Sequence, residues 1–162
     1  MRIKELLSNK KNKRNISVTG WVKTKREGKG IAFISLNDGS TINNLQIVVD
    51  IKKFNETLLK NITTGSCITV NGDLIDSEGS GQKKELTSNS IVLEGGADAN
   101  KYPLQPKKHS LEFLRTKAHL RFRTNTFSCV FRVRHSLTYA IHKFFNDQGF
   151  YKFVISVNYH RD

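Results

Sequence analysis

The stretch VTGWVKTKREGKGIAFISLNDGSTINNLQIVVD spans residues 18–50 and indicates the fold class. It contains three short runs that are rich in β-branched and aromatic residues. A basic loop that contains glycine separates the first two runs, and a turn at Asp38-Gly39 separates the second from the third. Such runs, joined by such turns, are typical of consecutive antiparallel strands. The stretch therefore predicts the opening half of a small β-barrel.

The second and third runs each have an apolar face and an outer face. Side chains alternate across a strand, so every second residue lies on the same face. The apolar positions are Ala32, Ile34 and Leu36 in the second run and Leu45, Ile47 and Val49 in the third. The outer face then carries Phe33 and Gln46. An even-numbered turn between the runs would bring these two side chains within one or two cross-strand positions of each other.

A helix and two further strands are predicted after the third run. The apolar residues of the helix share one face and are Phe54, Leu58, Leu59 and Ile62. Gly65 is in the position at which this helix would stop. Residues 66–76 and 83–94 are typical of strands joined by a flexible loop. Three strands, one helix and two strands are the order of the five-stranded OB-fold, so the fold class is mainly β.

The outer face of this barrel carries one aromatic and two polar candidates. In the last strand Leu86 faces inward, which turns Glu85 outward, although an exposed glutamate is usually only solvated. Two interpretations of Phe33 stay open. Another part of the chain could cover the ring, or the ring could be a base-stacking platform beside the amide of Gln46. Barrel-type sheets that recognise single-stranded nucleic acid use the second arrangement.

The segments that flank the barrel domain, residues 15–96, are predicted to differ from it. Residues 1–14 are basic, and their apolar patch is too short for a secretory signal or a membrane span, so we expect a short helix packed on the barrel. Residues 97–125 form a linker and hinge. Residues 126–148 predict a long amphipathic helix that ends at Gly149. Its apolar stripe either lies against the barrel or fits a partner surface.

The charge of the chain indicates the kind of partner. The formal net charge is +13 and the pI is near 9.9, which favours nucleic acid over a membrane surface, because no basic amphipathic helix of membrane type is present. Basic residues outnumber acidic ones six to one in residues 1–14 and twelve to three in residues 101–162. Residues 15–100 are nearly neutral, with nine basic and ten acidic residues. The flanks and the loop at residues 23–29 would therefore steer nucleic acid onto a nearly neutral barrel.

No pattern in the sequence indicates a catalytic or metal site. It contains no GxxxxGK[ST] phosphate loop, no HExxH and no GxSxG. The five histidines lie between residues 109 and 160 without metal-ligand spacing. Cys67 and Cys129 also lack such spacing and are expected to be reduced thiols of a cytoplasmic protein. We therefore expect no cofactor, no metal and no catalytic residue in this chain.

Seven motifs together carry a resemblance to a known family. They are VTGWVKTKR, FISLNDGS, LQIVVD, TTGSCITVNG, YPLQPKKHSLEFLR, HLRFRTN and HKFFNDQGF. In this order they resemble the N-terminal part of bacterial asparaginyl-tRNA synthetases, class II ligases related to the aspartyl and lysyl enzymes. The elements KxHSxEFLR and HLRxRTN after a barrel are more specific than the barrel alone. The resemblance runs from about residue 3 to Phe153.

The resemblance implies that the barrel binds the anticodon loop of the asparagine tRNA. By this likeness Phe33 would stack on an anticodon base, and Gln46 would read the central U. Glu85 would lie near the third anticodon position. These are the three residues that alternation independently places on the outer face.

The resemblance also implies roles outside the sheet face. Arg26, with Lys23 and Lys25 as weaker candidates, would hold phosphates or base edges. Residues 109–125 resemble the hinge into the catalytic domain. The long helix, within residues 126–162, resembles the start of that domain, which is part of the dimer interface in class II enzymes. The full-length enzymes use ATP and Mg²⁺ to attach asparagine to its tRNA.

The sequence also departs from the family pattern. Phe122 stands where the family has Pro, and Thr116 where it usually has Glu. After Phe153 the family strand is replaced by VISVNYHRD, and motifs 2 and 3, whose arginines hold ATP, are missing. We therefore expect an anticodon-binding fragment that is inactive as a ligase by itself. The alternatives are a separate tRNA- or RNA-binding module and a non-functional remnant of a truncated gene.

Overall fold

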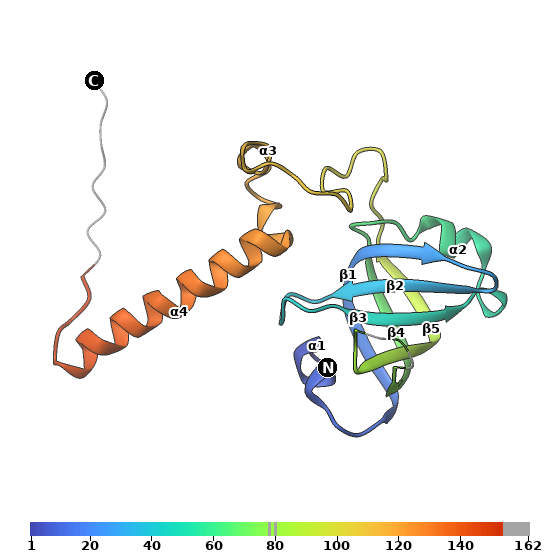
Figure 1. Cartoon of the computed structure of the whole chain (residues 1–162), viewed down its shortest axis with the longest axis horizontal. Coiled ribbons are helices and arrows are strands. Elements are labelled where there is room, and N and C mark those ends of the chain that lie inside the picture. The colour runs from blue at the N-terminus through green and yellow to red at the C-terminus, as the bar shows by residue number, and fades with distance from the viewer. Residues whose placement is uncertain (78, 80, 154–162) are drawn as a thin grey trace.

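The computed structural model describes residues 1–77, 79 and 81–153, and its centre is a closed five-stranded barrel (Figure 1). The strand order is β1-β2-β3-β5-β4. The strands are β1 (Lys13–Glu27), β2 (Ile31–Asn37), β3 (Leu45–Asp50), β4 (Cys67–Asp76) and β5 (Lys84–Gly95). The helices are α1 (Ile3–Ser8), η1 (Ile51–Lys53), α2 (Glu56–Asn61), α3 (Leu111–Thr116), η2 (Arg121–Arg123) and α4 (Asn125–Asp147). The expected mainly β barrel with an inserted helix is confirmed.

The barrel core consists of the residues that alternation predicts to face inward. All six apolar positions of β2 and β3 are completely buried. The other strands add Val18, Val22, Ile68, Val70, Leu74 and Leu86. β3 pairs in parallel with β5, and the other four strand pairs are antiparallel. β4 comes so close to β5 at Gly72 that a Cβ atom there would collide with the carbonyl oxygen of Thr87.

The helical segment between β3 and β4 is shorter than the sequence predicts. The side chains of Asp50 and Asn55 accept hydrogen bonds from the backbone N–H groups of Lys52 and Thr57, at 3.1 and 2.7 Å. Each bond caps a new helix start, so the segment divides into η1 and α2. Helix α2 ends before Gly65, and its apolar residue Leu59 is buried against the barrel core.

Helix α1 packs on the barrel, as expected for the basic N-terminal segment. Ile3 and Leu6 are completely buried in the core cluster. The carboxylate of Asp38 accepts a hydrogen bond from the Ile3 N–H at 2.8 Å, and the Ser40 hydroxyl oxygen accepts one from the Lys4 N–H at 3.0 Å. Desolvation works to raise the pKa of Asp38, but its hydrogen bonds from Ser40 and Ile3 outweigh this and lower it.

Helix α4 extends away from the barrel along most of its length (Figure 1). The side chain of Thr124 accepts a hydrogen bond from the Phe127 N–H and caps the helix start, and Gly149 has a φ of +84° just after its end. No residue of α4 is buried. Its apolar stripe is therefore not buried against the barrel among the described residues.

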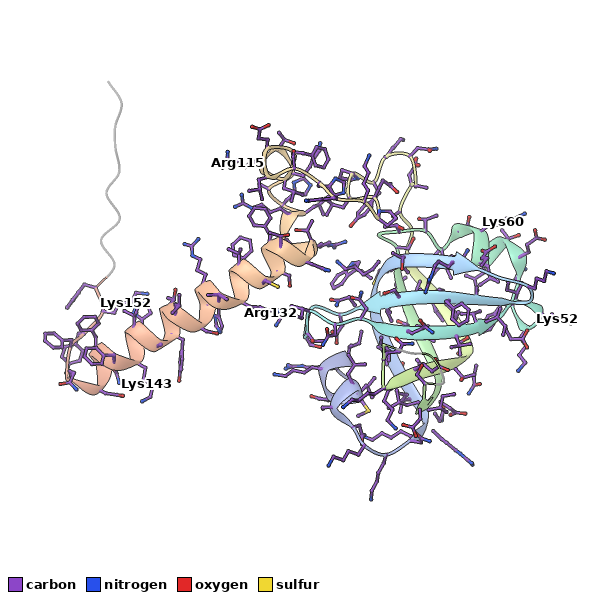
Figure 2. The ribbon with its side chains drawn as sticks, viewed as in Figure 1. Lys52, Lys60, Arg115, Arg132, Lys143 and Lys152 are labelled. Carbon is purple, nitrogen blue, oxygen red and sulfur yellow. The ribbon has the colours of Figure 1, made fainter. Side chains whose placement is uncertain are left out.

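Three arginines make contacts among α4, the hinge and the barrel. Arg132 donates hydrogen bonds from α4 to the carbonyl oxygens of Gly39 and Ser40 in the β2–β3 loop, and Figure 2 shows this side chain reaching toward the loop. The Arg121 guanidinium lies over two α4 rings, Phe127 and Phe131. The Arg123 guanidinium lies over the Trp21 ring of β1, 4.7 Å from its centroid.

In the described part of the chain, no helix is long and apolar enough to cross a membrane.

Candidate nucleic-acid interface

Two rows of side chains cross the outer face of strands β1, β2, β3 and β5. Residues that pair across neighbouring strands lie side by side on one face, so the strand registers define both rows. The first row consists of Thr24, Ser35, Gln46 and Glu85. The second row consists of Arg26, Phe33, Val48 and Thr87. A polar row therefore lies beside a row that contains a cation and an aromatic ring.

Phe33 and Gln46 are diagonal neighbours on this face. Phe33 is opposite Val48, and Gln46 is opposite Ser35, so the two side chains are one step apart across the strands and two residues apart along them. This is the relation that alternation and the turn predict. Both side chains are partly exposed, so the described part of the chain does not cover the ring completely. An aromatic ring beside an amide is the combination that can stack on one base and hydrogen-bond with another.

The polar row contains a connected network of hydrogen bonds. The Gln46 amide Nε2 donates to Glu85 Oε2 at 3.5 Å. The Ser77 hydroxyl, just after β4, donates to the same carboxylate oxygen at 3.0 Å. Gln46 and Glu85 are direct partners in the parallel pair of β3 and β5. Barrel closure therefore brings together two of the three anticodon candidates.

The structure separates the three basic candidates. Arg26 pairs with Phe33 and shares its face. Lys25 pairs with Ile34, a core position, and its ammonium group turns to the barrel end, where it donates to the Leu59 carbonyl at 2.5 Å and forms an ion pair with Glu27. Lys23 lies at an irregularity of β1 and donates to the Arg123 carbonyl in the hinge. Only Arg26 joins Phe33 and Gln46.

A polar hollow of about 840 Å³ lies on the face with Gln46. Sequence reasoning missed several of its lining residues, namely Thr24, Ser35, Asn43, Asn44, Gln82 and Lys83. Alternation could have found the first two, because they share the outer face of their strands with known candidates. The other four lie in loops, for which the sequence has no periodic signal. Amides and a lysine around a concave surface are suited to binding base edges and phosphate.

Lys23 lies in a second basic environment, beside the hinge. It lines a hollow together with Lys107, Lys108 and Arg123. Burial lowers the pKa of the Lys23 ammonium, and the positive charge of Arg123 lowers it further. An anion placed beside both groups would offset this repulsion. This hollow shares Thr24 and Asn44 with the hollow beside Gln46.

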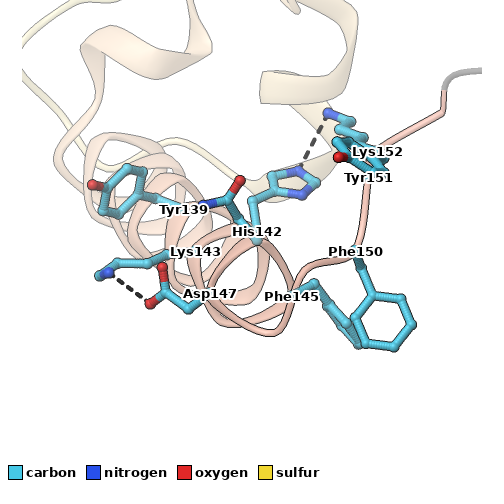
Figure 3. A pocket seen from close by; sticks show the side chains of 9 residues that line it. Tyr139, His142, Lys143, Phe145, Asp147, Phe150, Tyr151 and Lys152 are labelled. Carbon is cyan, nitrogen blue, oxygen red and sulfur yellow. Dashed lines mark hydrogen bonds and ion pairs between the residues drawn. The ribbon is translucent and has the colours of Figure 1, made fainter.

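A third hollow lies at the C-terminal end of α4 (Figure 3). An ion pair of 2.7 Å between Lys143 and Asp147 borders it, and Lys152 lies 3.3 Å from the His142 ring. Within residues 1–77, 79 and 81–153, no group of three or more His, Cys, Asp or Glu side chains could hold a metal ion. The described residues therefore do not fit a Mg²⁺ site.

Comparisons with known proteins identify the family of the barrel. The model of the OB-fold nucleic acid binding domain, the tRNA anticodon family, matches residues 16–94. The chain is 56% identical over 152 residues to an asparagine–tRNA ligase of Azobacteroides pseudotrichonymphae. The aligned region covers 94% of this chain and 33% of the relative. It is 53% identical to the asparagine–tRNA ligase of Cytophaga hutchinsonii, and the aligned region covers 93% of this chain and 33% of that relative. The chain belongs to the asparagine–tRNA ligase family.

The chain spans about one third of the length of the asparagine–tRNA ligases that it matches, and within that family it corresponds to the N-terminal anticodon-binding OB domain. Solved structures support the fold. The asparaginyl-tRNA synthetase of Entamoeba histolytica superposes with a TM-score of 0.75 at 17% identity, covering 88% of this chain and 35% of that one. The asparaginyl-tRNA synthetase of Pyrococcus horikoshii superposes with a TM-score of 0.70 at 22% identity, covering 84% of this chain and 33% of that one.

Proposed function

We propose that the chain binds the anticodon loop of the asparagine tRNA through the outer face of β1, β2, β3 and β5. Phe33 stacks on a loop base, and Gln46 reads the central U. Glu85 lies next to Gln46, and Arg26 holds a phosphate beside them. The observation that carries the proposal is the diagonal placement of an aromatic ring and an amide on one exposed face of a family OB barrel.

The wider activity of the relatives is part of the same proposal. In a complete ligase this face selects the tRNA to which asparagine is attached with ATP and Mg²⁺. ATP and Mg²⁺ would be held by the two thirds of the relatives that this chain does not span. The proposal places the protein in the cytoplasm, with the rest of the translation machinery. Lys25, which is engaged at the barrel end, and Lys23, which faces the hinge, have supporting roles at most.

The test is direct binding of the anticodon stem-loop of the asparagine tRNA in increasing salt. Phosphate contacts release counterions, so we expect affinity to fall about tenfold or more between roughly 50 and 200 mM salt. Arg26→Ala should lower the slope of log affinity against log salt by about one, the value for one phosphate contact. Lys143→Ala is the control, because Lys143 lies far along α4 and pairs with Asp147. An affinity unchanged by salt would contradict the proposal.

The exposed stripe of α4 supports a second part of the proposal, a homodimer. Its members recur at helical spacing and are Val130, Val133, Leu137, Ile141 and Phe144, each more than half exposed. A continuous apolar stripe of this length favours a partner surface. A second copy of the chain could cover it by placing its own α4 alongside.

Sedimentation velocity tests the homodimer. We expect concentration-dependent association of the chain, which the double substitution Leu137→Glu with Phe144→Glu abolishes, because both acidic groups would then be buried unpaired. Asn146→Glu on the opposite helix face adds a similar charge and should leave association unchanged. A wild-type chain that stays monomeric at high concentration would rule out this interface.

A further inference from the structure

A glutamine amide cannot by itself choose between uracil and cytosine. Its NH₂ group donates hydrogen bonds and its oxygen accepts them. The pairing edge of uracil presents an acceptor, O4, and a donor, N3–H, whereas that of cytosine presents a donor, N4–H₂, and an acceptor, N3. An amide that pairs with uracil would pair equally well with cytosine after a half turn about its terminal bond. A neighbouring group must therefore fix which way the Gln46 amide points.

Glu85 is the neighbour that can fix this orientation. Gln46 Nε2 donates to Glu85 Oε2 at 3.5 Å, and an ionised carboxylate can only accept hydrogen bonds. A half turn would place the Gln46 oxygen against the carboxylate oxygen, where the two partial negative charges repel. The parallel pairing of β3 and β5 keeps the two side chains on the same face. Glu85 thus favours one of the two amide orientations.

Glu85 is itself held by a chain of hydrogen bonds with a defined direction. The Ser77 hydroxyl oxygen accepts hydrogen bonds from the Gly79 N–H at 3.2 Å and from Gln82 Nε2 at 3.5 Å. Its own hydrogen is therefore free to be donated to Glu85 Oε2, 3.0 Å away. The start of the β4–β5 loop thus holds the carboxylate oxygen that accepts from Gln46.

The other side of the Gln46 amide is free for a ligand. Among the residues that the structure describes, Gln46 Oε1 accepts no hydrogen bond, and the side chain lines the polar hollow. With Nε2 held toward Glu85, Oε1 is available to a donor such as uracil N3–H. The second hydrogen of Nε2 remains available to an acceptor such as uracil O4. Cytosine presents the reverse pattern to both groups.

We propose that Glu85 is a positioning residue that fixes the Gln46 amide in the orientation that accepts uracil and rejects cytosine. The inference rests on the proposed role of Gln46 as the reader of the central base. It gives Glu85 a role that requires no contact with the RNA. The Ser77 hydroxyl, with its donors Gly79 and Gln82, then contributes to base choice indirectly, by holding the carboxylate.

The test compares Glu85→Gln with the wild-type chain in binding to two stem-loops that differ only in a GUU or GCU anticodon. The new amide can donate or accept, so it tolerates both orientations of Gln46. We expect binding of the GUU loop to weaken and binding of the GCU loop to strengthen. The wild-type preference, about tenfold or more for a good bidentate contact, should fall to within about threefold.

Three controls separate this role from a structural one. Gln46→Ala should lose the preference without any gain for the GCU loop. Adding Glu85→Gln to Gln46→Ala should change the ratio no further, because no amide remains to be oriented. Ser77→Ala should give a ratio between those of wild type and Glu85→Gln. Equal melting temperatures would show that the variants fold as the wild type does.

The affinities of the wild-type and Glu85→Gln chains for the two loops show whether Glu85 positions the Gln46 amide. A gain in affinity of Glu85→Gln for the GCU loop together with a loss for the GUU loop supports this role, because removal of the negative charge alone would strengthen binding of both loops. A Glu85→Gln chain that keeps the wild-type ratio, whether or not both affinities fall, overturns the inference and leaves the proposed function intact. A wild-type chain without any preference overturns the proposed function, and this inference with it.

Discussion

Phe33→Ala is expected to weaken binding of an anticodon stem-loop by about 1 to 3 kcal/mol, whichever base is at the central position. Stacking tolerates every base because every base has a π-face, so the loss should be similar for GUU and GCU loops. Phe33 is on the same face as Arg26 and Gln46 and is partly exposed, so its ring can reach a splayed base. Fluorescence titration of the two labelled loops measures the loss.

Val92→Ala is a matched control for the Phe33 substitution. Val92 is half exposed on β5, where it pairs with Thr69 of β4, outside the two rows of the proposed site. Its truncation should leave the binding free energy unchanged. If Phe33→Ala lowers the melting temperature but not the affinity, Phe33 is an ordinary packed surface residue. The stacking role would then be excluded.

Gln46→Ala is expected to remove the preference for U over C at the central position, which is worth about 1 to 3 kcal/mol for a bidentate base contact. Weak binding that depends on salt should remain, because phosphate contacts carry no sequence information. The two substitutions should thus differ in kind: Phe33→Ala lowers affinity at a constant ratio, and Gln46→Ala lowers the ratio. Competition between the two stem-loops separates these outcomes.

Asn71→Ala is the control for removal of an amide from the barrel surface. Asn71 is on β4 and donates to the Ser90 hydroxyl at 3.1 Å, outside the proposed site. The base preference of this variant should equal that of the wild type. A Gln46→Ala chain with an unchanged preference would show that another residue reads the central base. The amides of the β2–β3 loop, Asn43 and Asn44, would then be the next candidates.

The period-two pattern was sufficient to predict the barrel and part of its outer face. The core positions of β2 and β3, and the relation between Phe33 and Gln46, depend on strand alternation and a short turn, which are local features. Glu85 was placed outward by the same reasoning. Its contact with Gln46 was not predictable in this way, because it depends on β5 pairing in parallel with β3 when the barrel closes.

The basic candidates show where alternation alone does not determine the position of a side chain. The irregularity in β1 between Val22 and Thr24 interrupts alternation, which leaves Lys23 beside the hinge. Lys25 follows the alternation and is on the inward side of β1, but its long side chain emerges at the barrel end. A basic run in the sequence therefore points to several different surfaces. Only Arg26 is on the face with the aromatic ring.

In the proposed function this face reads the middle base of the asparagine anticodon. The decisive experiment is competition between GUU and GCU stem-loops for the wild-type chain at one salt concentration. We expect the GUU loop to bind about tenfold or more tightly than the GCU loop, because only uracil matches the held amide of Gln46. Equal binding of the two loops would exclude this role of the barrel face.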